Sequence, residues 1–332
     1  MIICSTPYRL SFFGGGTDYP TWFREHGGAV LSTTIDKYCY LTVRHLPPFF
    51  AHRHRIVYSR IENCSSVADI QHPAVRAALS YLRIDEGVEI HHDGDLPARS
   101  GIGSSSAFTV GLLHALHALQ GRMISKHDLA TQAIHVEQEI LHETVGVQDQ
   151  IASAYGGVNH ITFRREGSFC VCPLTLPRTR LDELQAHLML FFTRIERTAS
   201  DIACGYVPTL ASRTAPMGRI AGLVDESIAV LCGNGPIADF GHLMHEAWQR
   251  KRELCGVTSP TIDRCYADAQ AGGALGGKIT GAGGGGFMLL FVPPAAQEAV
   301  KNRLSGLLHV PFSFDYDGSR IVHYGEARKE AQ

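Results

Sequence analysis

Apolar positions in the first hundred residues fall into short β-prone runs. Each run is bounded by Gly, Pro or Asp, a pattern that predicts strands. A glycine pair at 156–157 leads into a further run of the same kind. We therefore expect strands at residues 8–13, 29–34, 38–43, 88–92 and 158–163.

Helical periodicity begins after residue 106. An apolar stripe with serines before it and a glycine after it predicts a helix over residues 107–119. Ser125 and Asp128 resemble a capping box and open a second predicted helix, over residues 125–142. The stripe of the first helix consists of Phe108, Leu112, Leu116 and Leu119.

Beyond about residue 180, strands alternate with longer helices. Helical stretches are predicted at residues 237–254 and 260–271, and a glycine-rich turn followed by a β-prone run at 278–291. We therefore expect an α+β fold with mixed or mainly antiparallel sheets. Its expected domains are residues 1–180 and 181–332.

The bulk composition is that of an ordinary folded protein. The 332 residues are 45% hydrophobic and 19% charged, enough for two domains. The net charge of -2 weighs against nucleic acid or an anionic membrane as the main partner. The start shows no secretory signal, and apolar runs such as 188–192 are far shorter than a membrane span. We expect a cytoplasmic protein with no membrane partner.

Neither the cysteines nor the histidines show a metal-binding pattern. Nine cysteines are scattered along the chain, and only Cys170 and Cys172 are close together, without a second pair at metal-ligand spacing. We interpret them as small buried hydrophobic residues in a reducing cytosol. The 18 histidines include no HExxH arrangement, and we assign them no role.

The most informative segment is the Gly/Ser loop that precedes the first predicted helix. Such a loop presents unpaired backbone N–H groups and the positive end of the helix dipole, which suits a phosphate group. Its hydroxyls can bind phosphate oxygens, and one can ligate magnesium. The alternative is a capped helix after a flexible turn. The candidate nucleotide-binding residues are Pro97, Arg99, Ser100, Gly101, Gly103, Ser104, Ser105 and Ser106.

Two other glycine patterns resemble nucleotide motifs in the wrong context. Residues 272–278 spell G-x-x-x-x-G-K, but Ile279 stands where a Walker loop needs Ser or Thr. Gly281, Gly283 and Gly286 match the dinucleotide fingerprint, yet a β-prone run follows them instead of a helix. Consecutive glycines still indicate close approach of another group to the backbone, and Gly281 and Gly283 are candidate substrate contacts.

Glu137 and Asp149 are candidate functional carboxylates. Glu137 has apolar residues three and four positions away, whereas the helical face of Glu139 is mostly polar. A carboxylate in an apolar stripe is costly unless a cation or donors meet it, so Glu137 is the better metal-ligand candidate. A Glu paired with some Arg is the alternative. Asp149 lies just past that helix and, taken alone, could cap a short helix.

Near the N-terminus, a β-prone run ends in a glycine turn with a polar pair. Gly14, Gly15 and Gly16 would let a small ligand reach the backbone. Asp18, next to Thr17, could accept hydrogen bonds from hydroxyls. The alternative is an ordinary turn with an Asx hydrogen bond.

In their order and spacing, three segments resemble the GHMP small-molecule kinases, the superfamily of galactokinase, homoserine kinase, mevalonate kinase and phosphomevalonate kinase. These segments are residues 7–19, 96–107 and 278–286. Within the superfamily, residues 8–18 and 145–157 are most similar to the D-glycero-D-manno-heptose 7-phosphate kinases. The resemblance implies a GHMP kinase fold, with an N-terminal domain like ribosomal protein S5 domain 2 and a ferredoxin-like C-terminal domain.

The resemblance also implies an activity and a set of residue roles. Heptose 7-phosphate kinases use ATP and Mg²⁺ to phosphorylate the anomeric hydroxyl of the sugar phosphate, which yields the 1,7-bisphosphate for nucleotide-activated heptose. By position, Asp149 matches the catalytic base and Arg9 the residue that orients it. The other matches are Ser105 and Glu137 as magnesium ligands, residues 101–106 as the phosphate cradle, and Thr17 and Asp18 as sugar contacts.

The sequence departs from the family at two arginines. Arg99 stands where the family often has Gly, which would make the loop stiffer or add a phosphate contact. Arg194 stands where the heptose kinases usually have Gly, which puts the exact substrate pocket in doubt. A sugar 7-phosphate needs cationic donors, preferably Arg. Arg197, at the start of a helix-like stretch, is the first candidate, followed by Arg194 and Lys37. A solvated surface position is the alternative for Arg197.

Two other functions stay open at this point. One is a free-sugar 1-kinase of the fucokinase or galactokinase type. The other is a non-catalytic regulator that binds sugar and ATP on the same fold, against which the retained Asp149, Glu137 and Arg9 argue. The sequence leaves the oligomeric state open, a homodimer included.

Overall fold

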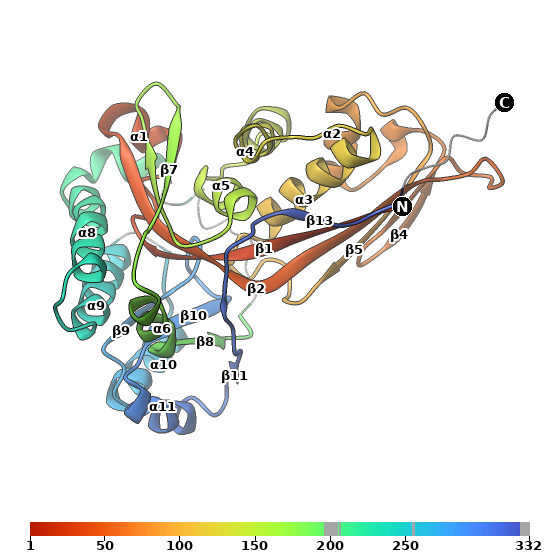
Figure 1. Cartoon of the computed structure of the whole chain (residues 1–332). Coiled ribbons are helices and arrows are strands. Elements are labelled where there is room, and N and C mark those ends of the chain that lie inside the picture. The colour runs from red at the N-terminus through yellow and green to blue at the C-terminus, as the bar shows by residue number, and fades with distance from the viewer. Residues whose placement is uncertain (196–204, 206, 254–255, 326–332) are drawn as a thin grey trace.

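A computed structural model describes residues 1–195, 205, 207–253 and 256–325 of the chain. Two β-sheets and their helices make up the molecule, and the smaller sheet lies below one end of the larger one (Figure 1). This arrangement confirms the expected α+β class. No helix in the described ranges is long and apolar enough to cross a membrane.

The larger sheet has nine strands, and its main path runs in the order β13-β1-β2-β5-β3-β4. β12 and β6 pair with β2, and β7 pairs with β6. Its strands are β1 (Ile2–Phe13), β2 (Gly28–His45), β3 (His54–Val57), β4 (Ile61–Cys64), β5 (Val88–Gly94), β6 (Asn159–Phe163), β7 (Phe169–Pro173), β12 (Phe314–Asp315) and β13 (Arg320–Tyr324).

β2 corrects one prediction, because the sequence predicts two strands where the structure has one. Asp36 looks like a strand boundary in the sequence, yet β2 continues through it. The backbone N–H of Asp36 donates to Ser313 O at 2.9 Å, and its carboxylate accepts from Ser313 N. The strand survives this polar position because a distant part of the chain pairs with it there.

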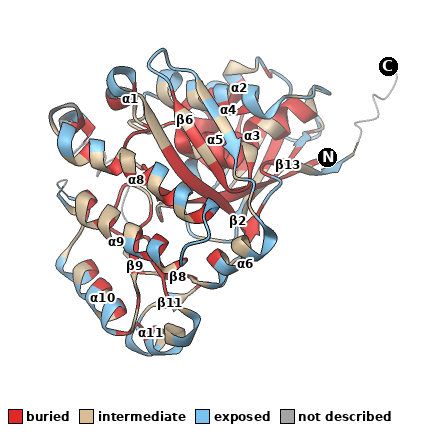
Figure 2. Ribbon diagram, turned by 60° about the vertical axis from the view of Figure 1, so that its left-hand side comes forward, coloured by how far each residue is buried: buried red, intermediate tan, exposed pale blue. Residues whose placement is uncertain are grey.

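Helices cover one face of the larger sheet. α3 (Ser104–Leu119) packs on both β1 and β2, and most of its residues are buried (Figure 2). Both predicted helices of this region form, but the second is interrupted: α4 ends at His135 and a π-helical turn follows. The helices on this face are α2 (Pro73–Tyr81), α3, α4 (Lys126–His135), the π turn η2 (Val136–Ile140) and α5 (Gln148–Tyr155).

The smaller sheet is antiparallel, with strand order β11-β8-β10-β9. Its strands are β8 (Leu188–Phe192), β9 (Gly276–Ile279), β10 (Phe287–Phe291) and β11 (Leu308–His309). Helices lie between β8 and β9 and between β10 and β11, the strand and helix sequence of a ferredoxin-like unit. They are α8 (Thr214–Cys232), α9 (Ala238–Arg252), α10 (Pro260–Ala271) and α11 (Gln297–Arg303).

Short helices and turns complete the fold. They are α1 (Pro20–His26), α6 (Arg178–Ala186) and the 3-10 turns η1 (Val67–Asp69), η3 (Val207–Ser212) and η4 (Pro294–Ala296). The division at residue 180 stays a prediction, with one amendment. β12 and β13 return from the second half of the chain to the larger sheet, so residues 181–332 do not form one continuous structural unit.

Candidate active site

The Gly/Ser loop and the C-terminal glycine loop pack directly against each other. A Cβ on Gly281 would lie 2.7 Å from both the Cα and the carbonyl oxygen of Gly101. One on Gly286 would lie 2.0 Å from Ser100 O, which accepts a hydrogen bond from Phe287 N at 3.1 Å. The expected close approach at these glycines is therefore real, and the approaching group is the chain itself.

The same contacts explain why the two nucleotide-like glycine motifs are misleading. Lys278 is a buried residue of β9 and does not lie in a loop before a helix. β10 follows Gly286 directly. Neither segment therefore has the strand–loop–helix context that a Walker or dinucleotide motif requires.

We expect Gly281→Ala to separate the two loops. At its φ of 66°, alanine is strained by about 1 kcal/mol, and the contact with Gly101 adds roughly 1–3 kcal/mol of overpacking. Gly121→Ala is the matched control, because Gly121 has a φ of 68° and no atom within 4 Å of a Cβ. Denaturant unfolding and kcat should therefore show a much larger loss for Gly281→Ala; equal losses would contradict the packing argument.

The Gly/Ser loop leads into the N-terminus of α3 with no side-chain cap. The N-cap residue, Gly103, has a left-handed φ of 73° and contributes no side chain. Ser104 Oγ instead accepts from Arg99 N at 3.2 Å, and Ser100 Oγ donates to Pro97 O at 2.6 Å. The first-turn N–H groups of α3 thus have no capping side chain, which is the condition for anion binding at a helix N-terminus.

Arg9 and Asp149 meet at this loop although 140 positions separate them in the chain. Arg9 Nε donates to Asp149 Oδ1 at 2.6 Å and Nη2 donates to Oδ2 at 2.7 Å. Nη1 donates to Gly101 O at 2.7 Å. The arginine side chain is 4% exposed and the aspartate side chain 24%. The structure therefore brings the two predicted catalytic residues together beside the predicted phosphate loop.

Glu137 is buried in the π turn η2, while Glu139 is exposed, as the sequence predicts. Glu137 Oε2 accepts from Ser106 Oγ at 2.9 Å and from the Gln150 amide. Its other oxygen, Oε1, has no hydrogen-bond partner among the described residues. Burial raises the pKa of this carboxyl to about 7, against the effect of nearby side-chain donors. An unpartnered buried carboxylate oxygen is suited to a hard cation.

The serine beside Glu137 differs from the one that the family comparison indicates. Ser105 is exposed, whereas Ser106 is buried and bonded to the carboxylate. Ser105 remains a prediction as a magnesium ligand, and Ser106 joins it as a second candidate. Sequence spacing could not separate the two, because both lie in the first turn of α3 and the burial of Ser106 depends on η2.

The N-terminal glycine turn holds Asp18 rigidly. Asp18 Oδ1 accepts from Gly16 N at 2.9 Å, and a Cβ on Gly146 would lie 1.9 Å from Oδ2. Burial, and next the Asp149 charge, raise the pKa of Asp18. A buried carboxylate facing the Arg9–Asp149 pair is compatible with its predicted contact to a sugar hydroxyl.

Thr17 and Gly14 have local structural roles instead. The Thr17 hydroxyl lies 2.8 Å from both Gly14 O and Ala29 O and accepts from Ala29 N, and the residue is fully buried. A Cβ on Gly14 would lie 2.0 Å from Ala29 O. These contacts give the two residues a structural role in the turn, and their assignment to the sugar stays a prediction.

The arginines that replace family glycines both have left-handed backbones. Arg99 has a φ of 59° and Arg194 a φ of 58°, and both side chains are exposed. Glycine adopts this conformation without strain, which is a physical reason to expect glycine at these positions. Lys37 is ion-paired with Asp36 at 2.9 Å, and Arg197 lies outside the described residues.

Sequence reasoning missed two buried lysines, Lys251 of α9 and Lys278 of β9. Lys251 Nζ donates to Gly281 O at 2.5 Å, and Lys278 Nζ donates to Phe12 O at 3.2 Å. Lys251 stands in the run Arg250-Lys251-Arg252, which looks like a solvated helix end. No local signal distinguishes it from its half-buried neighbours Arg250 and Arg252.

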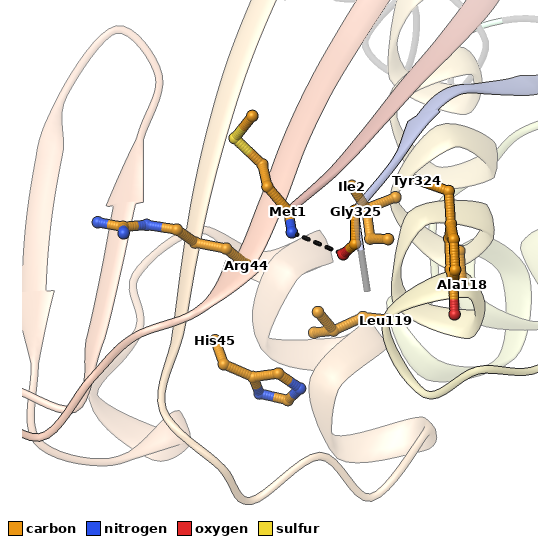
Figure 3. A pocket seen from close by; sticks show the side chains of 8 residues that line it. All are labelled: Met1, Ile2, Arg44, His45, Ala118, Leu119, Tyr324 and Gly325. Atoms are coloured by element: carbon orange, nitrogen blue, oxygen red, sulfur yellow. Dashed lines mark hydrogen bonds between the residues drawn. The ribbon is translucent and has the colours of Figure 1, made fainter. Parts of the chain in front are cut away.

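A separate pocket of about 340 Å³ lies at the far end of β1 from Arg9 (Figure 3). It is bordered by Met1, whose ammonium donates to Gly325 O at 3.0 Å, and by the C-terminal end of α3. The length of β1 puts it roughly 20 Å from the Arg9–Asp149 pair. It is therefore not part of this site. Its lining residues are Met1, Ile2, Arg44, His45, Ala118, Leu119, Tyr324 and Gly325.

Comparisons with known proteins define the class. The model of the GHMP kinases N terminal domain matches residues 70–157, and that of the GHMP kinases C terminal domain matches residues 228–309. Together the two ranges cover half of the chain, and they identify a phosphotransferase. The chain belongs to the GHMP kinases, which use ATP, typically with Mg²⁺.

Individual relatives agree with this family. The chain is 29% identical over 302 residues to D-glycero-alpha-D-manno-heptose 7-phosphate kinase of Campylobacter jejuni, covering 87% of this chain and 88% of the relative. It is 26% identical to L-fucokinase/L-fucose-1-P guanylyltransferase of Bacteroides fragilis, covering 90% of this chain but 35% of that protein. The crystal structure of a D-glycero-D-manno-heptose 1-phosphate kinase from Bacteroides thetaiotaomicron superposes with a TM-score of 0.80 at 24% identity, covering 98% of this chain and 100% of that one. This last likeness confirms the expected GHMP kinase fold.

Proposed function

We propose that this enzyme transfers the γ-phosphoryl group of ATP to the anomeric C1 hydroxyl of D-glycero-D-manno-heptose 7-phosphate, giving the 1,7-bisphosphate. The observation that carries the chemistry is the forked Arg9–Asp149 pair, bonded to Gly101 O of the Gly/Ser loop. The choice of sugar is supported by the name of the Campylobacter relative, which aligns over most of both chains.

In this mechanism the carboxylate of Asp149 acts as the base. The C1 hydroxyl proton moves to an oxygen of Asp149 as the C1 oxygen bonds to the γ-phosphorus, and the electron pair of the breaking bond stays on the ADP oxygen. Arg9 fixes the carboxylate through two hydrogen bonds and offsets charge in the transition state. Positioning and charge neutralisation supply most of the catalysis in phosphoryl transfer.

The magnesium ion that this family uses fits the residues around Glu137. The unpartnered Oε1 of that carboxylate and the adjacent serine hydroxyls of α3 are oxygen donors of the kind that Mg²⁺ prefers. We propose Glu137 with Ser105 or Ser106 as its ligands. When bound there, the ion would neutralise part of the phosphate charge.

A free-sugar 1-kinase is the second candidate, because the chain also aligns along 90% of its length with the fucokinase-containing relative of Bacteroides fragilis. A coupled ADP-release assay with MgATP over heptose 7-phosphate, L-fucose and D-galactose separates the two. ³¹P NMR of the product should give two phosphorus signals from one sugar, one of them from an anomeric phosphate. Faster turnover of free fucose or galactose than of any sugar 7-phosphate would overturn the heptose assignment and keep the kinase.

Arg197 is the proposed contact for the 7-phosphate. We expect Arg197→Ala to raise KM for heptose 7-phosphate about tenfold or more and to leave KM for ATP nearly unchanged, because a forked guanidinium contact to a dianion is lost. Arg178→Ala is the charge-matched control, since the Arg178 side chain is 76% exposed and pairs with Asp182. An unchanged KM for the sugar phosphate would mean that Arg197 is a solvated surface residue.

A further inference from the structure

Two lysines are buried behind the Arg9–Asp149 pair without a carboxylate of their own. Lys251 is 7% exposed and Lys278 is 5% exposed. Within the described ranges, each ammonium makes one hydrogen bond, to a backbone carbonyl. An ammonium has three donors, and a buried charge is costly unless it is paired. The fold alone gives no reason to retain such groups.

Lys251 shares its surroundings with both members of the Arg9–Asp149 pair. Arg9 of β1, Asp18 of the glycine turn and Asp149 of α5 act on it, and Lys251 in turn acts on Lys278 of β9. Burial, and next the charge of Lys251, lower the pKa of Lys278 well below its usual value. Burial, and next the charge of Arg9, lower the pKa of Lys251 to about 8, against the effect of the two carboxylates. Below that pH, Lys251 is therefore the second cation, beside Arg9, that faces Asp18 and Asp149.

Lys251 binds to one of the two loops that pack against each other. Its carbonyl partner belongs to Gly281, the residue that packs on Gly101, and Gly101 O binds Arg9. Arg9 and Lys251 therefore hold the two loops from the two sides of their contact. The charges that shift the pKa of Lys251 are those of Asp18 and of the Arg9–Asp149 pair. The charge that shifts the pKa of Glu137 is that of Glu143.

We propose that Lys251 is a positioning residue for phosphoryl transfer, whose ammonium holds the Gly281 loop against the phosphate loop and supplies positive charge beneath the Arg9–Asp149 pair. This role rests on the proposed reaction and not on which sugar accepts the phosphoryl group. Electrostatic preorganisation of this kind stabilises the charge that develops during transfer without reorganisation of the site.

The test compares Lys251→Met with Arg250→Met, which removes the same charge from the preceding residue. Arg250 is 44% exposed and pairs with Glu253 and Glu246 on the protein surface. We expect Lys251→Met to lower kcat on the order of tenfold to a hundredfold at a temperature where the variant is fully folded. Tm is measured beside it, because Gly281 O loses its donor. Arg250→Met should keep kcat within about threefold. A kcat within threefold in fully folded Lys251→Met would overturn the proposal, and so would a kcat that falls only at temperatures where the variant unfolds.

The pH profile gives a readout that a purely structural lysine would not change. The cationic form is lost as pH rises through the pKa of about 8, so kcat/KM for ATP in the wild type should fall on the alkaline side of this value. Lys251→Met should lack that limb, and Lys251→Arg should move it upward because Arg stays charged. Persistence of the limb in Lys251→Met would also overturn the proposal.

The assay is run with MgATP and heptose 7-phosphate, and in parallel with L-fucose and D-galactose. If the wild type turns over only a free sugar, the heptose assignment fails, while the ratio of variant to wild type on that sugar still decides the role of Lys251. If heptose 7-phosphate is turned over and Lys251→Met is as active as the wild type, the lysine proposal fails and the heptose assignment survives.

Discussion

Asp149→Asn is expected to lower kcat by about a hundredfold or more and to change ATP affinity little. The base takes the hydroxyl proton mainly in the transition state, so its loss appears in kcat rather than in KM. Asp149 is the second residue of α5, whose N-cap is Val147 and which has no side-chain cap. The expectation that Asp149 could cap a short helix is therefore corrected, and the substitution tests the base without the loss of a cap.

This substitution also leaves Arg9 without its ionic partner, and Arg9 is 4% exposed on its side chain. Removal of one member of a buried ion pair costs roughly 3–5 kcal/mol, so thermal unfolding must accompany the kinetics. The assay belongs at a temperature where the variant is fully folded, with nucleotide binding measured by titration calorimetry. Near-normal turnover of a folded Asp149→Asn would mean that Asp149 is a structural residue.

The pairing of Arg9 with Asp149 shows what sequence comparison can supply. Nothing in local periodicity relates two residues 140 positions apart, but the family motifs that contain them do. The departures at Arg99 and Arg194 are a second case. Both residues have left-handed backbones, so a glycine expected at these positions would indicate the backbone conformation and not a contact to substrate.

Local patterns predict the helices α3, α4, α9 and α10 and strands such as β1, β5, β6 and β10, but not the elements that depend on distant partners. β12 is two residues long and pairs with β2 across nearly the whole chain, so no local pattern indicates it. The burial of Lys251 depends on the Gly281 loop, which follows the lysine by 30 positions. The helical spacing around Glu137 predicts its burial correctly. However, the π turn leaves Ile140, counted among its apolar neighbours, 38% exposed.

In the metal-free protein, the free energy of unfolding should depend on pH through the Glu137 carboxyl. Its pKa in the folded protein, about 7, lies above the value of about 4.3 for an unperturbed Glu. Between these values the folded state holds a proton that the unfolded state has released, so this group makes stability fall as pH rises through that window. Glutamine does not titrate, so Glu137→Gln should remove this fall. Glu139→Gln should keep it.

The same carboxylate is expected to dominate the magnesium requirement. Glu137→Gln should raise the Mg²⁺ concentration for half-maximal activity about tenfold or more, because the amide replaces the charged oxygen that would meet the ion. In the wild type this concentration should rise as pH falls below about 7, where a proton competes for the carboxylate. That pH dependence should be lost in the Gln variant. Glu139→Gln is the control, since Glu139 lies two residues away and is exposed. Equal Mg²⁺ requirements in the two variants would remove Glu137 from the metal site, because the argument depends on the burial that distinguishes the two carboxylates.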